Sequence, residues 1–164
     1  MDKKKVCSLA SIVLGVVAIV MLFLPAIVVG DTEITYSGFS AIFGYTATEE
    51  TFLGDVSTKV LNFSFMNFVT FLLVVAAVVC SVLAFVKGNK VMSFAAIACF
   101  VVAAVLFFFM PAFASVYSAL DGALADAAIE AVKETYQLGA GAIIAAVCSL
   151  LAAGVAVASL FLKK

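Results

Sequence analysis

Residues 135–162 read TYQLGAGAIIAAVCSLLAAGVAVASLFL, and these 28 residues contain no Asp, Glu, Lys or Arg. A helix needs about 20 predominantly apolar residues to cross the roughly 30 Å of hydrocarbon in a bilayer. Three further stretches share this property, with 25, 27 and 30 residues: 6–30, 60–86 and 91–120. The sequence therefore predicts four membrane-spanning helices, which we place at 6–29, 62–86, 91–115 and 137–162.

The composition leaves room for a single membrane domain, residues 1–164. The chain is 66% hydrophobic, whereas soluble domains average about 45–50%. We expect an all-α integral membrane protein whose four transmembrane helices form an up-down-up-down bundle. The short connection 87–90 predicts a tight helical hairpin, and residues 30–61 and 116–136 form the two outer loops.

Lysine placement predicts the orientation. An up-down order puts the N-terminus, the connection 87–90 and the C-terminus on one side. Seven of the nine lysines lie there: Lys3, Lys4, Lys5, Lys87, Lys90, Lys163 and Lys164. Because cytoplasmic segments carry the excess of basic residues, we predict a multi-pass protein of the cell membrane with both termini in the cytoplasm. Nine of the ten acidic residues fall in the outer loops, so the outer face is strongly acidic.

The first span can also be read as a secretory signal peptide, since its start is basic. Its apolar run, however, exceeds the roughly 7–15 residues of a signal core, and Pro25-Ala26-Ile27 lacks the small-residue cleavage pattern. We therefore expect a retained span.

The four cysteines, Cys7, Cys80, Cys99 and Cys148, all fall in or at the edge of a span. A disulfide framework is not expected, and small polarizable side chains at helix contacts are the simpler interpretation. The chain has no histidine, so a zinc or haem site has no ligand set. We predict no metal and no cofactor.

Small residues recur along all four spans. Lipid tails are as apolar as leucine, so membrane helices associate through close packing, which small residues permit. The spacing predicts helix-packing positions at Gly15, Ala76, Cys80, Ala95, Cys99, Gly141, Ala145, Ser149 and Ala153. We expect these rows to pack the bundle internally, with contacts between copies as the alternative.

The first outer loop is patterned. Val28-Val29 and Ile34–Tyr36 flank turn residues and predict a small β-hairpin. Ser37 is suited to cap a short helix over 38–43, which Gly44 can end. We expect this helix to cover the mouth of the bundle and residues 46–57 to form a mobile acidic stretch. Alternation over 60–65 allows a further strand.

Two features mark the second outer loop and the span before it. Pro111 predicts a kink near the outer boundary, with 112–120 continuing as helix, and residues 118–136 predict a solvated helical extension that Asp121-Gly122 can interrupt. The alternative is a cation site, since Ca²⁺ favours carboxylate oxygens. Its ligands would be Asp121, Asp126, Glu130 and Glu134 together with Glu49 and Glu50.

The chain starts with three lysines, ends its first span with Leu24-Pro25 and continues with Tyr36-Ser37-Gly38-Phe39 and Phe43-Gly44. In these features it resembles uncharacterised small four-span membrane proteins of Gram-positive bacteria, a resemblance that implies the fold and no activity. In layout it also resembles the claudins. Their first-loop tryptophan, Gly-Leu-Trp string and cysteine pair have no counterparts here, so barrier and pore-forming roles are not implied.

An enzyme is not expected, because the spans contain hydroxyls and thiols but no base, and the outer acids have no histidine partner. The spans also lack the carboxylates typical of ion-coupled transport. A small self-assembling channel or transporter subunit is the alternative function, with small-residue faces, or Asn67 and Thr70, lining a pore between subunits.

We predict an integral membrane interaction or scaffold protein that presents an acidic, aromatic cap outside the membrane. Its partner would be a membrane or envelope protein, or a second copy in a homo-oligomer, and nucleic acid is not expected. The candidate contact residues are Tyr36, Phe39, Phe43, Tyr45, Glu49 and Glu50.

Overall fold

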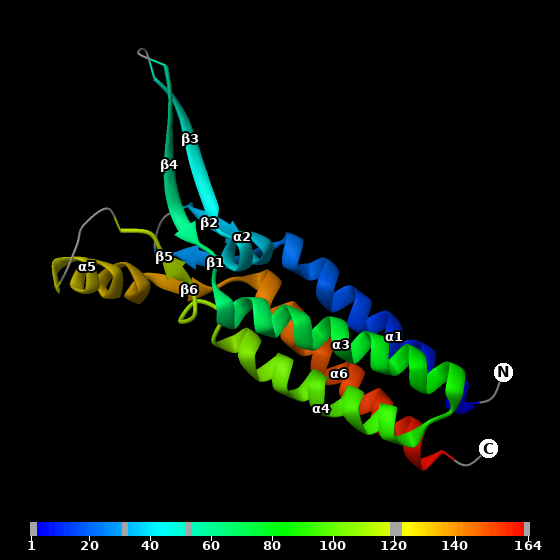
Figure 1. Ribbon diagram of the computed structural model, residues 1–164. Coiled ribbons are helices and arrows are strands. Elements are labelled where there is room, and N and C mark those ends of the chain that lie inside the picture. Colours follow the sequence, from blue (N-terminus) through cyan, green and yellow to red (C-terminus); the bar gives the residue numbers. More distant parts are fainter. Residues whose placement is uncertain (1–2, 31–32, 52–53, 119–122, 163–164) are drawn as a thin grey trace.

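The computed structural model describes residues 3–30, 33–51, 54–118 and 123–162. Within them lie four helices that are long and apolar enough to cross a membrane, which confirms the predicted number of spans by length and composition. They run side by side (Figure 1). Their bounds are α1 (Lys3–Val20), α3 (Phe65–Lys87), α4 (Lys90–Phe108) and α6 (Ala140–Phe161).

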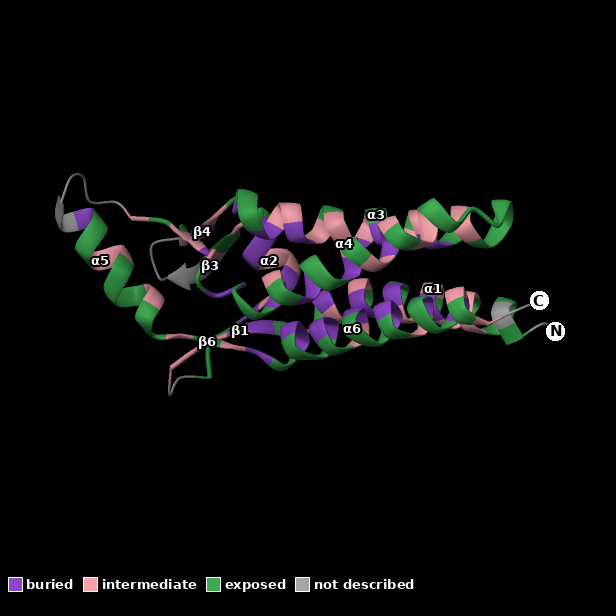
Figure 2. Ribbon diagram, turned by 90° about the horizontal axis from the view of Figure 1, so that it is seen from below, coloured by how far each residue is buried: buried purple, intermediate pink, exposed green. Residues whose placement is uncertain are grey.

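The four helices close into a ring. Helix α1 packs against α3 and α6, and α4 packs against the same two helices. Figure 2 shows α3 and α4 as one layer and α1 and α6 as the other, with buried residues on the facing sides. Both termini and the α3–α4 turn lie at one end of the bundle, which we call the terminal end; the strands, α2 and α5 lie at the other, the capped end (Figure 1).

The α3–α4 turn is as tight as predicted. Gly88 ends α3 in the left-handed conformation with φ of 64°, and its N–H donates to the Ala84 carbonyl. The Asn89 side chain then accepts a hydrogen bond from the Val91 N–H and caps α4. The left-handed glycine and the N-cap asparagine thus each satisfy one free backbone group, a carbonyl at the end of α3 and an N–H at the start of α4.

The first helix is shorter than the sequence predicted. Helix α1 ends at Val20, a 3₁₀ turn η1 (Met21–Phe23) follows, and β1 (Pro25–Val29) occupies the rest of the region placed in the span 6–29. Pro25 has no N–H to donate to a preceding turn, so it favours the end of a helix. The residues beyond it pair with other strands instead.

The predicted kink at Pro111 and the helix continuing over 112–120 are wrong for the described residues. Helix α4 ends at Phe108, and the chain turns through hydrogen bonds from Phe113 N to Phe109 O and from Ala114 N to Pro111 O. It then forms the short strand β5 (Ser115–Val116). Proline cannot donate the hydrogen bond that a helix interior requires, and pairing with a strand takes the backbone elsewhere.

Two small sheets build the cap. In the first, β1 lies between β2 (Thr35–Ser37) and β6 (Tyr136–Leu138), and the predicted β1–β2 hairpin is confirmed. The predicted short helix is α2 (Gly38–Phe43), with the Ser37 side chain accepting from the Ser40 N–H. In the second sheet, β4 (Gly54–Asn62) lies between β3 (Tyr45–Thr51) and β5.

The acidic stretch 46–57, which we predicted to be mobile, forms two strands in its described residues, 46–51 and 54–57. These residues lie in the β3–β4 hairpin, whose register runs from Tyr45 opposite Leu61 to Thr51 opposite Gly54. The hairpin projects away from the bundle (Figure 1). The strand allowed over 60–65 is the end of β4, which stops at Asn62.

The second outer loop contains the predicted helix, α5 (Ala123–Glu134). It does not extend the spans, because β5 separates it from α4 and β6 separates it from α6. Residues 119–122, including the Asp121-Gly122 interruption, lie outside the described part of the chain.

The predicted packing residues fall on the core face in two helices and beside it in the other two. Gly15, Gly141, Ala145, Ser149 and Ala153 are buried, whereas Cys80, Ala95 and Cys99 are half-buried and Ala76 is exposed. The buried positions of α3 are Asn67, Thr70, Val74, Ala77 and Ser81. Those of α4 are Ala96, Phe100, Ala103, Ala104 and Phe107.

A candidate recognition surface at the capped end

The cap is fastened to the bundle by buried polar side chains at the start of α3. Asn67 is fully buried, and its Nδ2 donates to the carbonyl oxygens of Ala41 and Met110, each at 3.2 Å. The Ser64 hydroxyl donates to the Phe113 carbonyl at 2.6 Å, and its backbone N–H donates to the Ile42 carbonyl at 2.9 Å. Helix α3 therefore fixes both α2 and the segment that follows α4.

Close backbone contact fixes the first sheet on α6. The Gly139 N–H donates to the Ala26 carbonyl at 2.8 Å. A Cβ on Gly139 would lie 2.6 Å from the Pro25 carbonyl oxygen, and one on Gly141 would lie 2.8 Å from that of Leu24. A side chain at either position would push β1 off the helix, so the two glycines allow the sheet and the bundle to form one unit.

Three tyrosines join the two sheets. The ring centroid of Tyr36 lies 5.6 Å from that of Tyr45 and 6.2 Å from that of Tyr136. Burial, and secondarily the nearby Tyr36, raises the pKa of Tyr136 to about 12. Burial and then Tyr45 raise the pKa of Tyr36. Both phenols are therefore neutral near pH 7 and act through packing rather than as acids or bases.

Phenylalanines fill the junction of α2 with η1 and α3. Phe39 packs on Phe23 at 4.6 Å between ring centroids and meets the edge of Phe71 at 5.9 Å. Phe43 stacks on Phe39 and meets the edge of Phe68 at 6.0 Å. Such tilted and edge contacts add to the burial of apolar area, and they hold α2 over the bundle as the sequence predicted.

The β3–β4 hairpin carries little core of its own. Thr46, Thr48, Thr58 and Lys59 are exposed, and the Thr48 and Ser57 hydroxyl oxygens lie 3.2 Å apart across the strands. A two-stranded hairpin without an apolar face is marginally stable in water. Its attachment is at the base, where Leu61 is buried and pairs with Val116 of β5.

Both long edges of the projecting part are open. In the described residues β3 pairs with β4 alone, and β4 pairs with β5 only at Leu61 and Asn62. Unpaired N–H and C=O groups along a strand edge form a template for another strand. The hairpin can thus accept a further strand through its main chain.

The structure divides the predicted contact residues into three groups. Tyr36 is buried and Phe39 is half-buried inside the cap. Phe43 and Tyr45 are 52% and 43% exposed, so both can meet a partner. Glu49 and Glu50 lie in β3 opposite Val56 and Asp55, and their side chains lie outside the described part of the structure.

The acidic residues do not gather into a metal site in the part of the chain that the structure describes. Asp126, Glu130 and Glu134 are all exposed on α5, while Asp121 and the side chains of Glu49 and Glu50 are not described. These three exposed carboxylates make the described surface of α5 acidic.

The hairpin was missed in the sequence although a signal was present. Tyr45-Thr46-Ala47-Thr48 and Val56-Ser57-Thr58-Lys59-Val60 are rich in β-branched residues, which favour strands. The polar character of both faces concealed the alternation on which strand prediction depends.

No protein-family model, curated protein or solved structure matches this chain.

Proposed function

We propose that the protein is a membrane-anchored interaction protein that presents the β3–β4 hairpin to an extended segment of another protein chain. The observation that carries this proposal is a projecting hairpin with open strand edges on a rigidly fastened base. An added strand would complete the sheet by main-chain hydrogen bonds, the mode known as β-augmentation.

The chemistry of the surface suggests the character of that segment. The two loops at the capped end, 30–61 and 116–136, contain nine acidic residues and two lysines. Electrostatic attraction therefore favours a partner segment with basic side chains. Phe43 and Tyr45, each about half exposed, lie at the base of the hairpin and supply apolar contact to its side chains. The partner is a membrane or envelope protein, or a second copy of this chain.

The alternative channel function requires small-residue helix faces, or Asn67 and Thr70, to line a pore between subunits. Both are interior to the subunit, at 0% and 1% exposed, and Asn67 bonds to carbonyls of the same chain. This burial counts against Asn67 and Thr70 as lining residues of a pore between subunits.

A shortened hairpin tests the proposal. Ala47 and Thr58 lie opposite each other, so residues 48–57 can be replaced by Asn-Gly, which forms a two-residue turn. The base at Tyr45 and Leu61 is unchanged. Loss of two or more backbone hydrogen bonds at roughly 1 kcal/mol each lowers affinity by about tenfold or more.

A photo-crosslinking residue is placed at position 46 in both hairpins, and the cells are irradiated. The readout is the crosslinked adduct, which mass spectrometry identifies. The proposal expects one defined adduct in the full hairpin, strongly reduced in the shortened one. A control with Thr48→Val and Ser57→Val changes side chains but keeps the strand edges, and should retain the adduct. An adduct of twice the 17.0 kDa chain mass identifies a second copy. The proposal is contradicted if the shortened hairpin gives as much adduct as the full hairpin. It is also contradicted if a crosslinking residue placed at Glu130 on α5 gives the same adduct in equal amount.

A further inference from the structure

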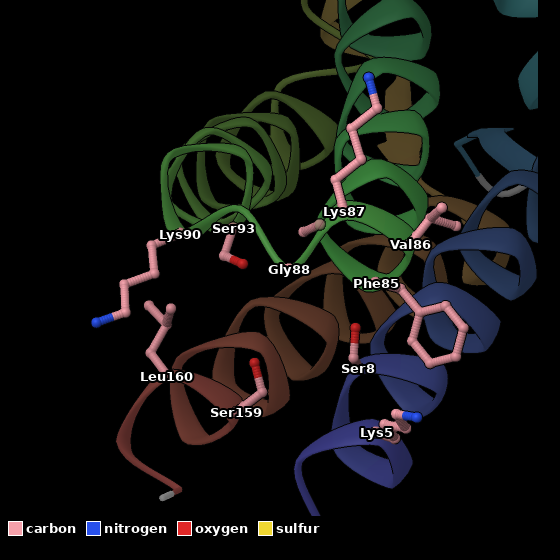
Figure 3. A pocket seen from close by; sticks show the side chains of 11 residues that line it. Lys5, Ser8, Phe85, Val86, Lys87, Gly88, Lys90, Ser93, Ser159 and Leu160 are labelled. Carbon is pink, nitrogen blue, oxygen red and sulfur yellow. The ribbon is translucent and has the colours of Figure 1, made fainter. Parts of the chain in front are cut away.

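A cavity of about 290 Å³ opens at the terminal end of the bundle, far from the hairpin. It lies between α1, the α3–α4 turn, α4 and α6. Figure 3 shows the hydroxyls of Ser8, Ser93 and Ser159, from three different helices, around the space between the helices. Hydroxyls from separate elements that line one space can serve a single ligand group.

The cavity continues inward as a narrow pocket of about 10 Å³. Its lining adds Ser11 and Ser81 to the three serines of the outer cavity. A volume of this size holds about one small group, such as a single water or oxygen atom. The Ser11 hydroxyl donates to the Ala152 carbonyl at 2.9 Å and so ties α1 to α6 beside this pocket.

Ser81 points to a ligand independently of the cavity. Its side chain is 4% exposed, and its Oγ has no hydrogen-bond partner. A buried hydroxyl without a partner costs about 1–3 kcal/mol in a folded protein. A ligand oxygen reaching the narrow pocket would accept a hydrogen bond from it.

The rim of the cavity is basic. Lys5, Lys87 and Lys90 line its mouth, and no carboxylate is among the described residues that do so. In Figure 3 their ammonium groups lie around the mouth and are directed away from its centre. Lysine carries its charge on a flexible four-carbon stem, so these groups can reach an anion at the mouth.

Apolar side chains complete the lining. Phe85, Val86 and Leu160 lie beside the lysines, and both Phe85 and Val86 are exposed on the outside of α3. A ligand that joins an anionic group to apolar chains would contact both kinds of residue. Basic pockets between membrane helices are known to bind the headgroups of anionic lipids.

We propose that this cavity binds a phosphate group, supplied by the headgroup of an anionic phospholipid at the terminal end. The hydroxyls of Ser8, Ser81 and Ser93 donate to its oxygens, and the three lysines neutralise its charge. The Ser11 and Ser159 hydroxyls are not donors to the ligand, because they already donate to the Ala152 and Ala156 carbonyls. The bound group would join α1, the α3–α4 turn and α6, which contribute separate parts of the lining. The proposal does not depend on the function of the hairpin.

The test uses the full chain in a zwitterionic detergent, with thermal unfolding and native mass spectrometry as readouts. Phosphatidylglycerol should raise the unfolding temperature and stay bound, whereas phosphatidylcholine should do neither. Inorganic phosphate is the third probe: stabilisation by it alone, with no gain from the lipid, assigns the phosphate site to a free anion. No stabilisation by either phosphatidylglycerol or inorganic phosphate overturns the proposal.

Two variants locate the site. The first variant removes the three positive charges at the mouth by combining Lys5→Gln, Lys87→Gln and Lys90→Gln. It should bind phosphatidylglycerol about tenfold or more weakly. The matched control, Lys59→Gln with Lys133→Gln, removes two lysines from the capped end and should leave the binding unchanged. Equal affinity in the triple variant and the wild type contradicts the site.

Ser81→Ala separates ligand binding from folding. Removing an unpartnered buried hydroxyl should raise the unfolding temperature of the lipid-free protein. The same variant should bind phosphatidylglycerol about tenfold more weakly, because it loses a donor to a charged group. A merely structural role predicts a change in stability alone, and an unchanged lipid affinity would overturn the part assigned to Ser81.

Discussion

Gly15 of α1 lies directly against the ring of Phe100 in α4, and a Cβ built on Gly15 would be 2.7 Å from the Phe100 Cζ atom. The same Cβ would lie 2.6 Å from the Val78 Cγ2 atom of α3. Phe100 is fully buried. The space left by the missing side chain of Gly15 is therefore filled by Phe100, which with Phe107 is one of the two largest fully buried side chains in the described residues. Three helices meet at this point.

Gly15→Ala should destabilise the bundle. Overpacking a filled core costs about 1–3 kcal/mol, so the thermal unfolding temperature in detergent, followed by circular dichroism, should fall. Gly154→Ala is the matched control, because a Cβ there meets nothing within 4 Å and alanine favours a helix by about 0.5–1 kcal/mol. If the Gly15 variant is as stable as the Gly154 variant, the prediction is wrong, and Phe100 and Val78 can move to accommodate the added methyl group.

Asn67→Leu should loosen the cap. It removes both hydrogen bonds to the Ala41 and Met110 carbonyls, and buried acceptors left without a donor cost about 1–3 kcal/mol. Thr70→Val is the control, since its hydroxyl bonds only the Met66 carbonyl within the same helix. Limited proteolysis of the cap should accelerate in the Asn67 variant and stay near the wild-type rate in the control. Equal rates in both variants contradict this role of Asn67.

Stability should fall at alkaline pH through Tyr136. Its pKa is raised to about 12 in the folded state, against about 10 in an unfolded chain. The folded protein holds this proton more tightly, so the resulting stability is complete below about pH 10 and is lost as the pH rises towards 12. Unfolding temperatures measured across this window should decline less steeply in Tyr136→Phe. An identical decline in both proteins would contradict the assignment to Tyr136.

The orientation predicted from the lysines can be tested by labelling. In a chain with all four cysteines replaced by alanine, Asn89→Cys should react with a membrane-impermeant maleimide only after the cells are opened. Thr58→Cys, on the exposed hairpin, should react in intact cells, because the positive-inside rule places the terminal end in the cytoplasm. The reverse pattern would invert the topology.

The sequence by itself determined the four helices long and apolar enough to cross a membrane, the tight turn at Gly88-Asn89 and the capped helix after Ser37. Each depends on local information: a charge-free length that exceeds the bilayer core, a glycine that favours the left-handed end of a helix, or a serine that bonds a neighbouring N–H. The elements that the sequence misplaced depend on partners distant in the chain. Val29 in β1 pairs with Tyr136, which is more than a hundred residues away in the chain. The apolar residues 25–29 also fit the end of a membrane helix, so their sequence alone could not reveal a strand.

Tertiary structure alone decided which faces are inside. Small residues occur on several faces of α3 and α4, and spacing could not distinguish the row with Ala76 from the row with Ala77. Buried hydrogen bonds of Asn67 and the fit of Gly15 to Phe100 fix that rotation, because in lipid close packing and polar contacts, rather than hydrophobicity, choose the interface. The same packing leaves the hairpin edges open at the capped end and gathers serines and lysines at the terminal end, and neither arrangement is visible in a single span.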